Sequence, residues 1–157
     1  KSFIKSLKSF KGLPHRHEIF YKKNNKIFIN DSKATSFEAA KFALKSKKNI
    51  FWILGGLPKQ KDKITFKKFK NNILKSYIIG KSVNFFRKQL QGEINFTISK
   101  FLKIAVANAI KDAKLLNNQN NIVLLSPAAA SFDQFQNFEK RGDEFKRLCK
   151  LYVNKYY

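Results

Sequence analysis

The sequence predicts an α/β fold, in which a Rossmann-like, mostly parallel sheet is covered by helices and an antiparallel hairpin is added near the N-terminus. Three continuous apolar runs end at glycine or proline, which is typical of strands buried on both faces of a sheet: NIFWILGG, SYIIG and NIVLLSP. Stretches of helical periodicity alternate with these runs. Alternation of strand and helix favours a parallel sheet with crossover helices.

The first elements along the chain are a short helical stripe and a hairpin. Apolar residues in 3–10 recur at helical spacing, and Gly12 and Pro14 end the pattern, so residues 1–12 look like the tail of something upstream. HEIFY and KIFIN then flank KKNN, which predicts two extended runs around an Asn-Asn turn.

The remaining elements follow from periodicity. The sequence predicts strands in the three apolar runs, which cover residues 49–56, 76–80 and 121–127. It predicts helices over residues 37–45, 82–91, 99–116 and 138–155. No internal repeat or linker interrupts this order, so residues 13–157 are expected to form one domain.

Composition bounds the class of protein. The 157 residues are 43% hydrophobic and include 17 Phe, which is enough for a core. No apolar run approaches the length of a membrane span, and the single cysteine, Cys149, lies in a helical pattern that suits a buried thiol. We expect a soluble cytosolic protein. Because the chain contains no Met, we also expect it to be a fragment of a longer protein.

The net charge of +23 raises an alternative function, a basic α/β module that binds nucleic acid or another polyanion without catalysis. Only four of the 33 basic residues are Arg, and the Lys residues are spread along the whole chain. Proteins that read nucleic acid usually use Arg and cluster their charge. Lys, Asn, Ile, Phe and Tyr are all written by A- and T-rich codons, so genome composition explains the charge equally well.

Three polar loops are expected at one edge of the sheet, where ligands of such folds bind. They are NDSKATS after the hairpin, GGLPKQKDK after the first apolar run and SPAAASFDQF after the last. Each offers hydroxyls, Lys or backbone N–H groups at the start of a helix, which together suit a carboxylate or phosphate ligand.

Each loop also has a purely structural explanation. Residues 35–38 and 131–134 both fit a helix-capping box, and Gly55-Gly56 could simply turn the chain. The two histidines, His15 and His17, alternate in a segment that should be extended, so they would face opposite sides and share no metal. No GxxxxGK(S/T) loop and no GxSxG elbow is present.

The segments GLPHRHE, INDSKAT, Gly55-Gly56 followed by Lys59, and LLSPAAASFDQFQNFEKRGDEF resemble the C-terminal domain of the Mur ligases. The similarity covers roughly residues 10–150 in the same order, and its last segment is specific to the family branch that adds D-glutamate. Ala129 stands where the family typically has Cys, and Ser36 where it often has Asn.

This resemblance implies an ATP- and Mg²⁺-dependent amide ligase of peptidoglycan synthesis in the bacterial cytoplasm. Such an enzyme phosphorylates the carboxylate of UDP-N-acetylmuramoyl-L-alanine, and the amine of D-glutamate then attacks the acyl phosphate. The family holds the nucleotide sugar, the P-loop and magnesium on upstream domains of the same polypeptide. Residues 1–12 would then end the central ATP-binding domain or a linker, and residues 13–157 would be the amino-acid-binding domain, inactive alone. Nucleic acid and membrane partners are not expected.

The resemblance also implies residue roles. Arg16, Asp31 and Lys33 correspond to nucleotide-binding positions, and Lys33 lies near the phosphates as the catalytic residue. No metal ligand is implied in this chain. D-Glutamate brings two carboxylates and an ammonium, so its pocket needs donors. The positions that correspond to this pocket are Thr35, Lys59, Ser131, Phe132 through its backbone, and Phe138.

Overall fold

A computed structural model of the chain describes residues 12–116 and 119–157. The expected helical stripe in residues 3–10 lies outside the described residues. The assignment of residues 1–12 to a preceding domain or linker does so too, apart from Gly12.

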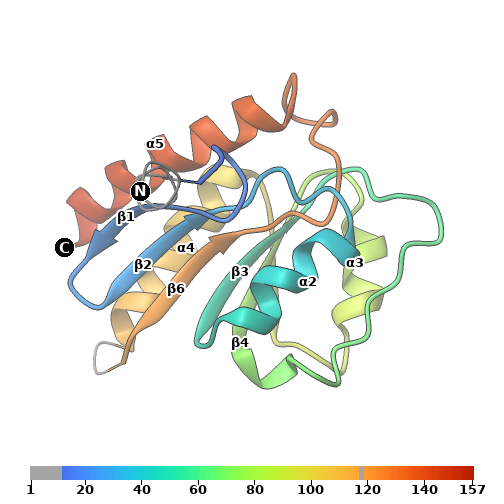
Figure 1. Ribbon diagram of the computed structural model, residues 1–157, viewed down its shortest axis with the longest axis horizontal. Helices are drawn as coiled ribbons and strands as arrows, with labels where there is room; N and C mark the ends of the chain where they lie inside the picture. The colour runs from blue at the N-terminus through green and yellow to red at the C-terminus, as the bar shows by residue number, and fades with distance from the viewer. Residues whose placement is uncertain (1–11, 117–118) are drawn as a thin grey trace, which may run out of the picture.

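Six strands form one sheet in the order β1-β2-β6-β3-β4-β5 (Figure 1). β1 and β2 pair antiparallel, and every other neighbouring pair is parallel. The predicted α/β fold with an added N-terminal hairpin is therefore confirmed. The strands are β1 (Glu18–Lys23), β2 (Lys26–Asn30), β3 (Ile50–Gly55), β4 (Ile73–Ile79), β5 (Phe96–Lys100) and β6 (Asn121–Leu125).

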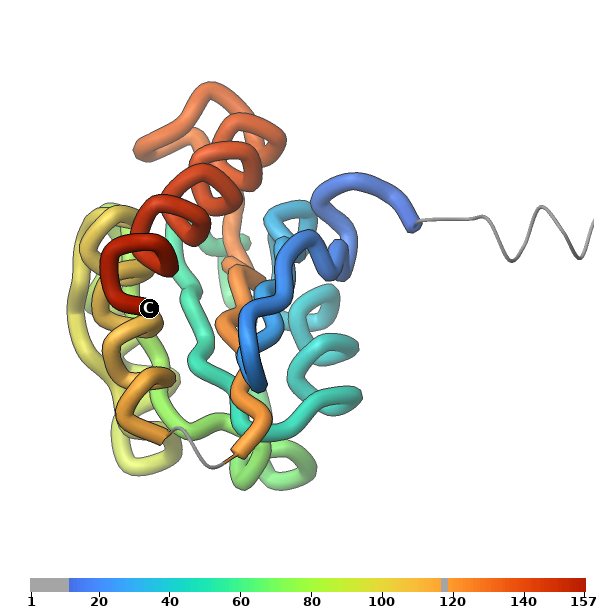
Figure 2. The backbone as a smooth tube through the Cα atoms, turned by 90° about the vertical axis from the view of Figure 1, so that its left-hand side faces the viewer, coloured from blue at the N-terminus to red at the C-terminus, as the bar shows by residue number. Residues whose placement is uncertain are grey.

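Helices cover both faces of the sheet. Figure 2 shows α2 on one side of the strands and α4 with α5 on the other. A short 3-10 helix, η1, leads into β4. The helices are α2 (Phe37–Ser46), η1 (Lys70–Asn72), α3 (Val83–Leu90), α4 (Leu102–Leu115) and α5 (Phe138–Tyr156). None of the helices that the structure describes is long and apolar enough to cross a membrane.

The central strand β3 explains why its sequence is a continuous apolar run. Trp52 and Leu54 belong to the core cluster under α2 and α3, whereas Phe51 and Ile53 belong to the cluster under α4 and α5. Successive side chains of a strand point to opposite faces, and here both faces are covered. Cys149 of α5 is buried in the second cluster as a free thiol, as predicted.

The predicted helix over residues 99–116 was wrong at its start. Residues 96–100 form the edge strand β5, and Lys100, with a φ of 63°, separates this strand from α4. Phe101, which the prediction put inside the helix, precedes it and is 62% exposed. β5 has a strand neighbour on one side alone and is partly exposed, so its sequence lacks the continuous apolar run that identified the inner strands.

Candidate functional site

Three loops leave the carboxyl ends of neighbouring strands at the same edge of the sheet. The first loop (residues 31–36) follows β2, the second loop (56–69) follows β3, and the third loop (126–137) follows β6. These strands are adjacent and parallel, and the last residue of β2, Asn30, pairs with the last residue of β6, Leu125. The predicted gathering of the three polar loops is confirmed.

Backbone hydrogen bonds join the loops to one another. The amides of Leu57 and Ala130 each donate to the other residue's carbonyl at 2.9 Å, which ties the second loop to the third. The amide of Ala128 donates to the carbonyl of Ala34 at 2.8 Å, which ties the third loop to the first. The three loops are therefore joined to one another through their backbones.

Gly55 and Gly56 are required by this close approach and do more than turn the chain. Their φ angles of 127° and 135° lie in a region that L side chains rarely adopt. A Cβ atom on Gly55 would overlap the carbonyl oxygen of Ile79, and one on Gly56 would overlap that of Ala130. The glycine pair thus lets the second loop pass directly against β4 and the third loop.

Asp31 fixes the shape of the first loop. Its Oδ1 accepts a hydrogen bond from the backbone N–H of His17 at 3.0 Å, and its Oδ2 accepts one from the Ser126 hydroxyl at 2.7 Å. Burial raises the pKa of the Asp31 carboxyl, although these two hydrogen bonds and the charge of Arg16 act in the opposite direction. The carboxylate is accordingly held by one donor from the turn before β1 and one from the start of the third loop.

One cleft of about 330 Å³ brings together the three residues predicted to bind a nucleotide, Arg16, Asp31 and Lys33. Arg16 and Lys33 are exposed and supply two positive charges, whereas Asp31 is buried at the base of the first loop. The cleft is completed by His17, Ala34, Ala39 and Phe42.

Four cleft residues were not predicted, and the two with ring side chains are His17 and Phe42. The Phe42 side chain is 68% exposed, and its ring contacts that of His17 edge-on, with 5.3 Å between the centroids. The buried positions of α2 are Phe37, Ala40, Ala43 and Leu44, and Phe42 is not among them. The sequence could have indicated this exposed ring, because Phe42 is a large aromatic residue that lies off the apolar stripe of the helix.

The segment with the two histidines is a turn, and the prediction of an extended conformation was wrong. His15 and His17 have φ angles of 63° and 46°. Nδ1 of His15 lies 2.9 Å from Nδ2 of Asn30, so His15 packs inside the fold. Burial and, secondarily, the charge of Lys47 lower the pKa of His17. In residues 12–116 and 119–157 no three His, Cys, Asp or Glu side chains gather as a metal site.

The residues predicted for D-glutamate lie in the three joined loops and at the start of α5. Ser131 is 2% exposed, and its hydroxyl has no hydrogen-bond partner among the described residues. Lys59 is exposed in the second loop, Thr35 and Phe138 are half-buried, and Phe132 is 70% exposed. The buried hydroxyls of Ser76, Ser99 and Tyr157 also have no partner among the described residues, but among these four only Ser131 lies in the joined loops, where a polar ligand could satisfy it.

Neither of the two capping boxes is formed as the sequence suggested. The N-cap of α2 is Ser36, whose hydroxyl accepts from the amide of Ala39 at 3.2 Å, so Thr35 is left outside the helix. The helix after the third loop begins at Phe138, where Asn137 is the N-cap, and Ser131 caps nothing. The prediction that Thr35 and Ser131 could cap helices is therefore wrong.

The chain is similar to known ligases. It is 44% identical over 144 residues to the UDP-N-acetylmuramoylalanine--D-glutamate ligase of Nitrobacter winogradskyi, 48% over 141 residues to that of Brucella abortus, and 45% over 145 residues to that of Rhizobium meliloti. These alignments cover 89–92% of the chain but 30–31% of each relative, so the chain spans about a third of their length. No protein-family model matches the chain.

By sequence, the chain is a homologue of the C-terminal domain of this ligase family. In this ligase-family domain, the cleft lined by Asp31 and Lys33 adjoins the first loop, and the Ser131 hydroxyl lies in the third loop. Backbone hydrogen bonds join these two loops. Lys33 also contacts the first residue of α5, since its Nζ lies 5.6 Å from the ring centroid of Phe138.

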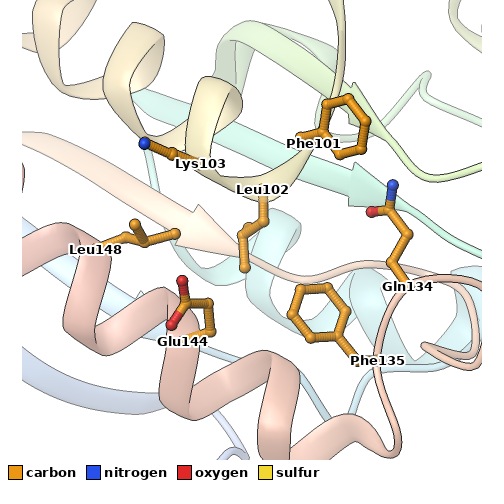
Figure 3. A pocket seen from close by; sticks show the side chains of 7 residues that line it. All are labelled: Phe101, Leu102, Lys103, Gln134, Phe135, Glu144 and Leu148. Carbon is orange, nitrogen blue, oxygen red and sulfur yellow. The ribbon is translucent and has the colours of Figure 1, made fainter.

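The ligase-family domain has a further cavity of about 370 Å³ between the start of α4, the third loop and α5 (Figure 3). None of the predicted site residues lines it, and its walls are largely apolar. The lining side chains are those of Phe101, Leu102, Lys103, Gln134, Phe135, Glu144 and Leu148.

Proposed function

We propose that this chain is the D-glutamate-binding domain of an ATP-dependent ligase that acts on UDP-N-acetylmuramoyl-L-alanine in bacterial peptidoglycan synthesis. The observation that carries the proposal is the identity of 44–48% to ligases named for D-glutamate addition. The three polar loops joined at one sheet edge support it, because they place both predicted groups of residues on one surface.

In the proposed reaction, the muramoyl-alanine carboxylate takes the terminal phosphoryl group of ATP, and the amine of D-glutamate then displaces phosphate to form the amide. Arg16 and Lys33 contribute positive charge to the cleft, where they would screen phosphate oxygens. Lys33 is the residue we assign to the phosphates. Asp31 would accept a hydrogen bond from a ribose hydroxyl while its protein donors keep it in place.

The D-glutamate carboxylates would be met by donors from all three loops. Ser131 has an unused hydroxyl, Lys59 an exposed ammonium and Thr35 a hydroxyl outside the helix. The amide of Phe132 would add a backbone donor, and the ring of Phe138 would cover the methylene groups of the amino acid. Small side chains at residues 128–130 would let the ligand approach the backbone closely.

The residues of this chain fit part of a nucleotide but not the whole ATP–Mg²⁺ complex. The cleft holds two cations and one carboxylate, whereas the described residues group no three metal-ligating side chains and the sequence has no P-loop. We infer that upstream domains of the same polypeptide hold most of the triphosphate and magnesium. This chain would then bind the amino acid and close over the nucleotide, which orients the two reactants.

The test is phosphate release by the full-length polypeptide with ATP, Mg²⁺ and UDP-N-acetylmuramoyl-L-alanine, comparing D-glutamate with L-glutamate. Release that requires the D-isomer is expected. Equal release with both isomers would refute the assignment of the pocket. Turnover by the 157-residue chain alone would refute the division of labour between domains.

The second candidate is a polyanion-binding module, which the net charge of +23 favours. Four lysines, Lys41, Lys45, Lys67 and Lys68, line one surface depression together with Thr65 and Phe69. Binding of single-stranded or duplex DNA would then fall steeply between low and physiological salt. Absence of measurable DNA binding at low salt would eliminate this candidate.

A further inference from the structure

A buried arginine lies behind the candidate site. Arg141 belongs to the first turns of α5 and is 1% exposed. Its Nε donates to the hydroxyl of Ser32 at 3.0 Å, and one terminal nitrogen donates to the carbonyl of Ser32 at 2.7 Å. The other terminal nitrogen donates to the carbonyl of Ala129 at 3.0 Å.

Neutral oxygens alone accept these three hydrogen bonds. None of the ion pairs among the described residues includes Arg141. Burial lowers the pKa of Arg141 to about 10, against the opposing influence of Asp133, so the guanidinium stays charged at neutral pH. Burying a charge that forms no ion pair and has neutral acceptors alone is costly, and a hydrophobic residue would fill the space at a lower cost. The presence of a charged arginine at this buried position is therefore not explained by its contribution to stability.

The geometry links all parts of the candidate site. Ser32 stands directly between Asp31 and Lys33, and Ala129 is two residues from Ser131. The hydroxyl of Ser32 also donates to the carbonyl of Phe138 at 2.8 Å. A single side chain thus holds the first loop, the third loop and the start of α5 together.

We propose that Arg141 is a positioning residue that sets the distance between the nucleotide group at Lys33 and the D-glutamate group at Ser131. The proposal rests on the proposed function. Lysine could not replace it, because one ammonium cannot reach the Ser32 carbonyl, the Ser32 hydroxyl and the Ala129 carbonyl in the directions that a planar guanidinium covers. A small displacement of one reactant relative to the other is enough to slow an oriented reaction.

The experiment compares Arg141→Lys with Arg147→Lys in the full-length ligase. Arg147 lies on the same helix but is exposed, and it pairs with Glu144 at 2.8 Å, so its replacement keeps the charge without touching the loops. For Arg141→Lys we expect the KM for D-glutamate to rise and kcat to fall, each on the order of ten-fold, with an unchanged KM for the UDP substrate. Arg147→Lys should behave as wild type.

Ser32→Ala removes an acceptor from the same contact and gives a second test. Its effect on the KM for D-glutamate should be smaller than that of Arg141→Lys, and the double variant should show less than the sum of both. A lower melting temperature of Arg141→Lys with wild-type kinetic constants would overturn the positioning role. Full additivity of the two substitutions would overturn the shared contact.

Hydrogen exchange separates failure of this inference from failure of the proposed function. If the wild-type polypeptide shows no D-glutamate-dependent phosphate release, the proposed function fails. Amide exchange can still be compared in the first and third loops of the 157-residue chain. Faster exchange in both loops for Arg141→Lys, but not for Arg147→Lys, would support the positioning role of Arg141. Unchanged exchange in both loops would overturn it.

Discussion

The ammonium of Lys33 lies 5.6 Å from the centre of the Phe138 ring, so the first loop touches the first residue of α5 at the sheet edge. Lys33 belongs to the group proposed for the nucleotide, and Phe138 to the group proposed for D-glutamate. A phosphorylated carboxylate and an attacking amine must come within contact distance of each other. The contact between these two side chains puts the two proposed groups next to each other, which is consistent with that requirement.

Replacement of Phe138 tests this neighbourhood. Phe138→Leu keeps an apolar side chain but removes the ring beside Lys33, so we expect the KM for D-glutamate to rise several-fold with little change in the KM for ATP. Phe132→Leu is the matched control, because only the backbone amide of Phe132 is assigned to the ligand and its side chain is 70% exposed. Steady-state kinetics give the KM for D-glutamate of both variants. An equal rise in both would contradict the assignment of the Phe138 ring to the D-glutamate pocket.

Lys59 is expected to bind a carboxylate of D-glutamate. Lys59→Ala should raise the KM for D-glutamate on the order of ten-fold or more, because a charge-assisted hydrogen bond is lost. Lys63→Ala removes another exposed lysine of the second loop and should leave this KM unchanged. If the two variants have the same KM, Lys59 is a surface lysine and does not belong to the pocket.

Phe42 is exposed and lines the cleft, so we expect its ring to contact the base of the proposed nucleotide. Because aromatic rings and nucleobases stack, Phe42→Ala should raise the KM for ATP several-fold while the KM for D-glutamate stays constant. Phe101→Ala is the control, since Phe101 is 62% exposed but lines the other cavity (Figure 3). If Phe42→Ala has the wild-type KM for ATP, Phe42 does not contact the nucleotide, and the charged residues of the cleft alone remain as candidates.

Gly56 is expected to be essential for the joined loops. Gly56→Ala introduces a Cβ against the carbonyl oxygen of Ala130 at a φ of 135°, whereas Gly92 has a φ of 78°, which is less costly for an L residue, and no atom within 4 Å of an added Cβ. Gly92→Ala should reduce the free energy of unfolding by about 1 kcal/mol through its backbone conformation alone. Gly56→Ala should cost at least about 2 kcal/mol more because of the overlap. Urea unfolding of both variants measures the difference. Similar losses of unfolding free energy would show that the second and third loops can move apart to accommodate the added Cβ.

The parts of this fold that could be predicted are those determined by local sequence. β3, and β6 after its first residue Asn121, are continuously apolar because both faces of the sheet are covered, and the end of each strand predicted where the next loop begins. β5 was missed because it is an edge strand. Ser131 was predicted as a possible cap because the spacing to Gln134 fits one, but the chain continues as a turn. The contact between Ser32 and Arg141 joins residues 109 positions apart, and no local pattern announces it.

Glu18 predicts how the domain responds to acid. Burial opposes ionisation of this carboxyl, but hydrogen bonds from the amide of His15 and the side chain of Asn30, together with the charge of Lys146, lower its pKa below the ordinary 4.5. A carboxyl whose pKa is lower in the folded state adds stability above its ordinary pKa. That stability is lost as the pH falls through the lowered value. The free energy of unfolding of the wild type should therefore fall as the pH drops below about 4.5.

Glu18→Gln should make this fall shallower, because glutamine keeps a hydrogen-bond acceptor for His15 and Asn30 but does not titrate. Glu139→Gln replaces an exposed carboxyl that takes part in none of the ion pairs among the described residues, so its curve should follow that of the wild type. Urea unfolding at a series of pH values measures all three slopes. Parallel curves for the wild type and Glu18→Gln would mean that other carboxylates set the acid response. The hairpin would then owe its attachment to α5 to packing of Phe20 against Phe145, whose ring centroids are 5.6 Å apart, and little to the pair of Glu18 and Lys146.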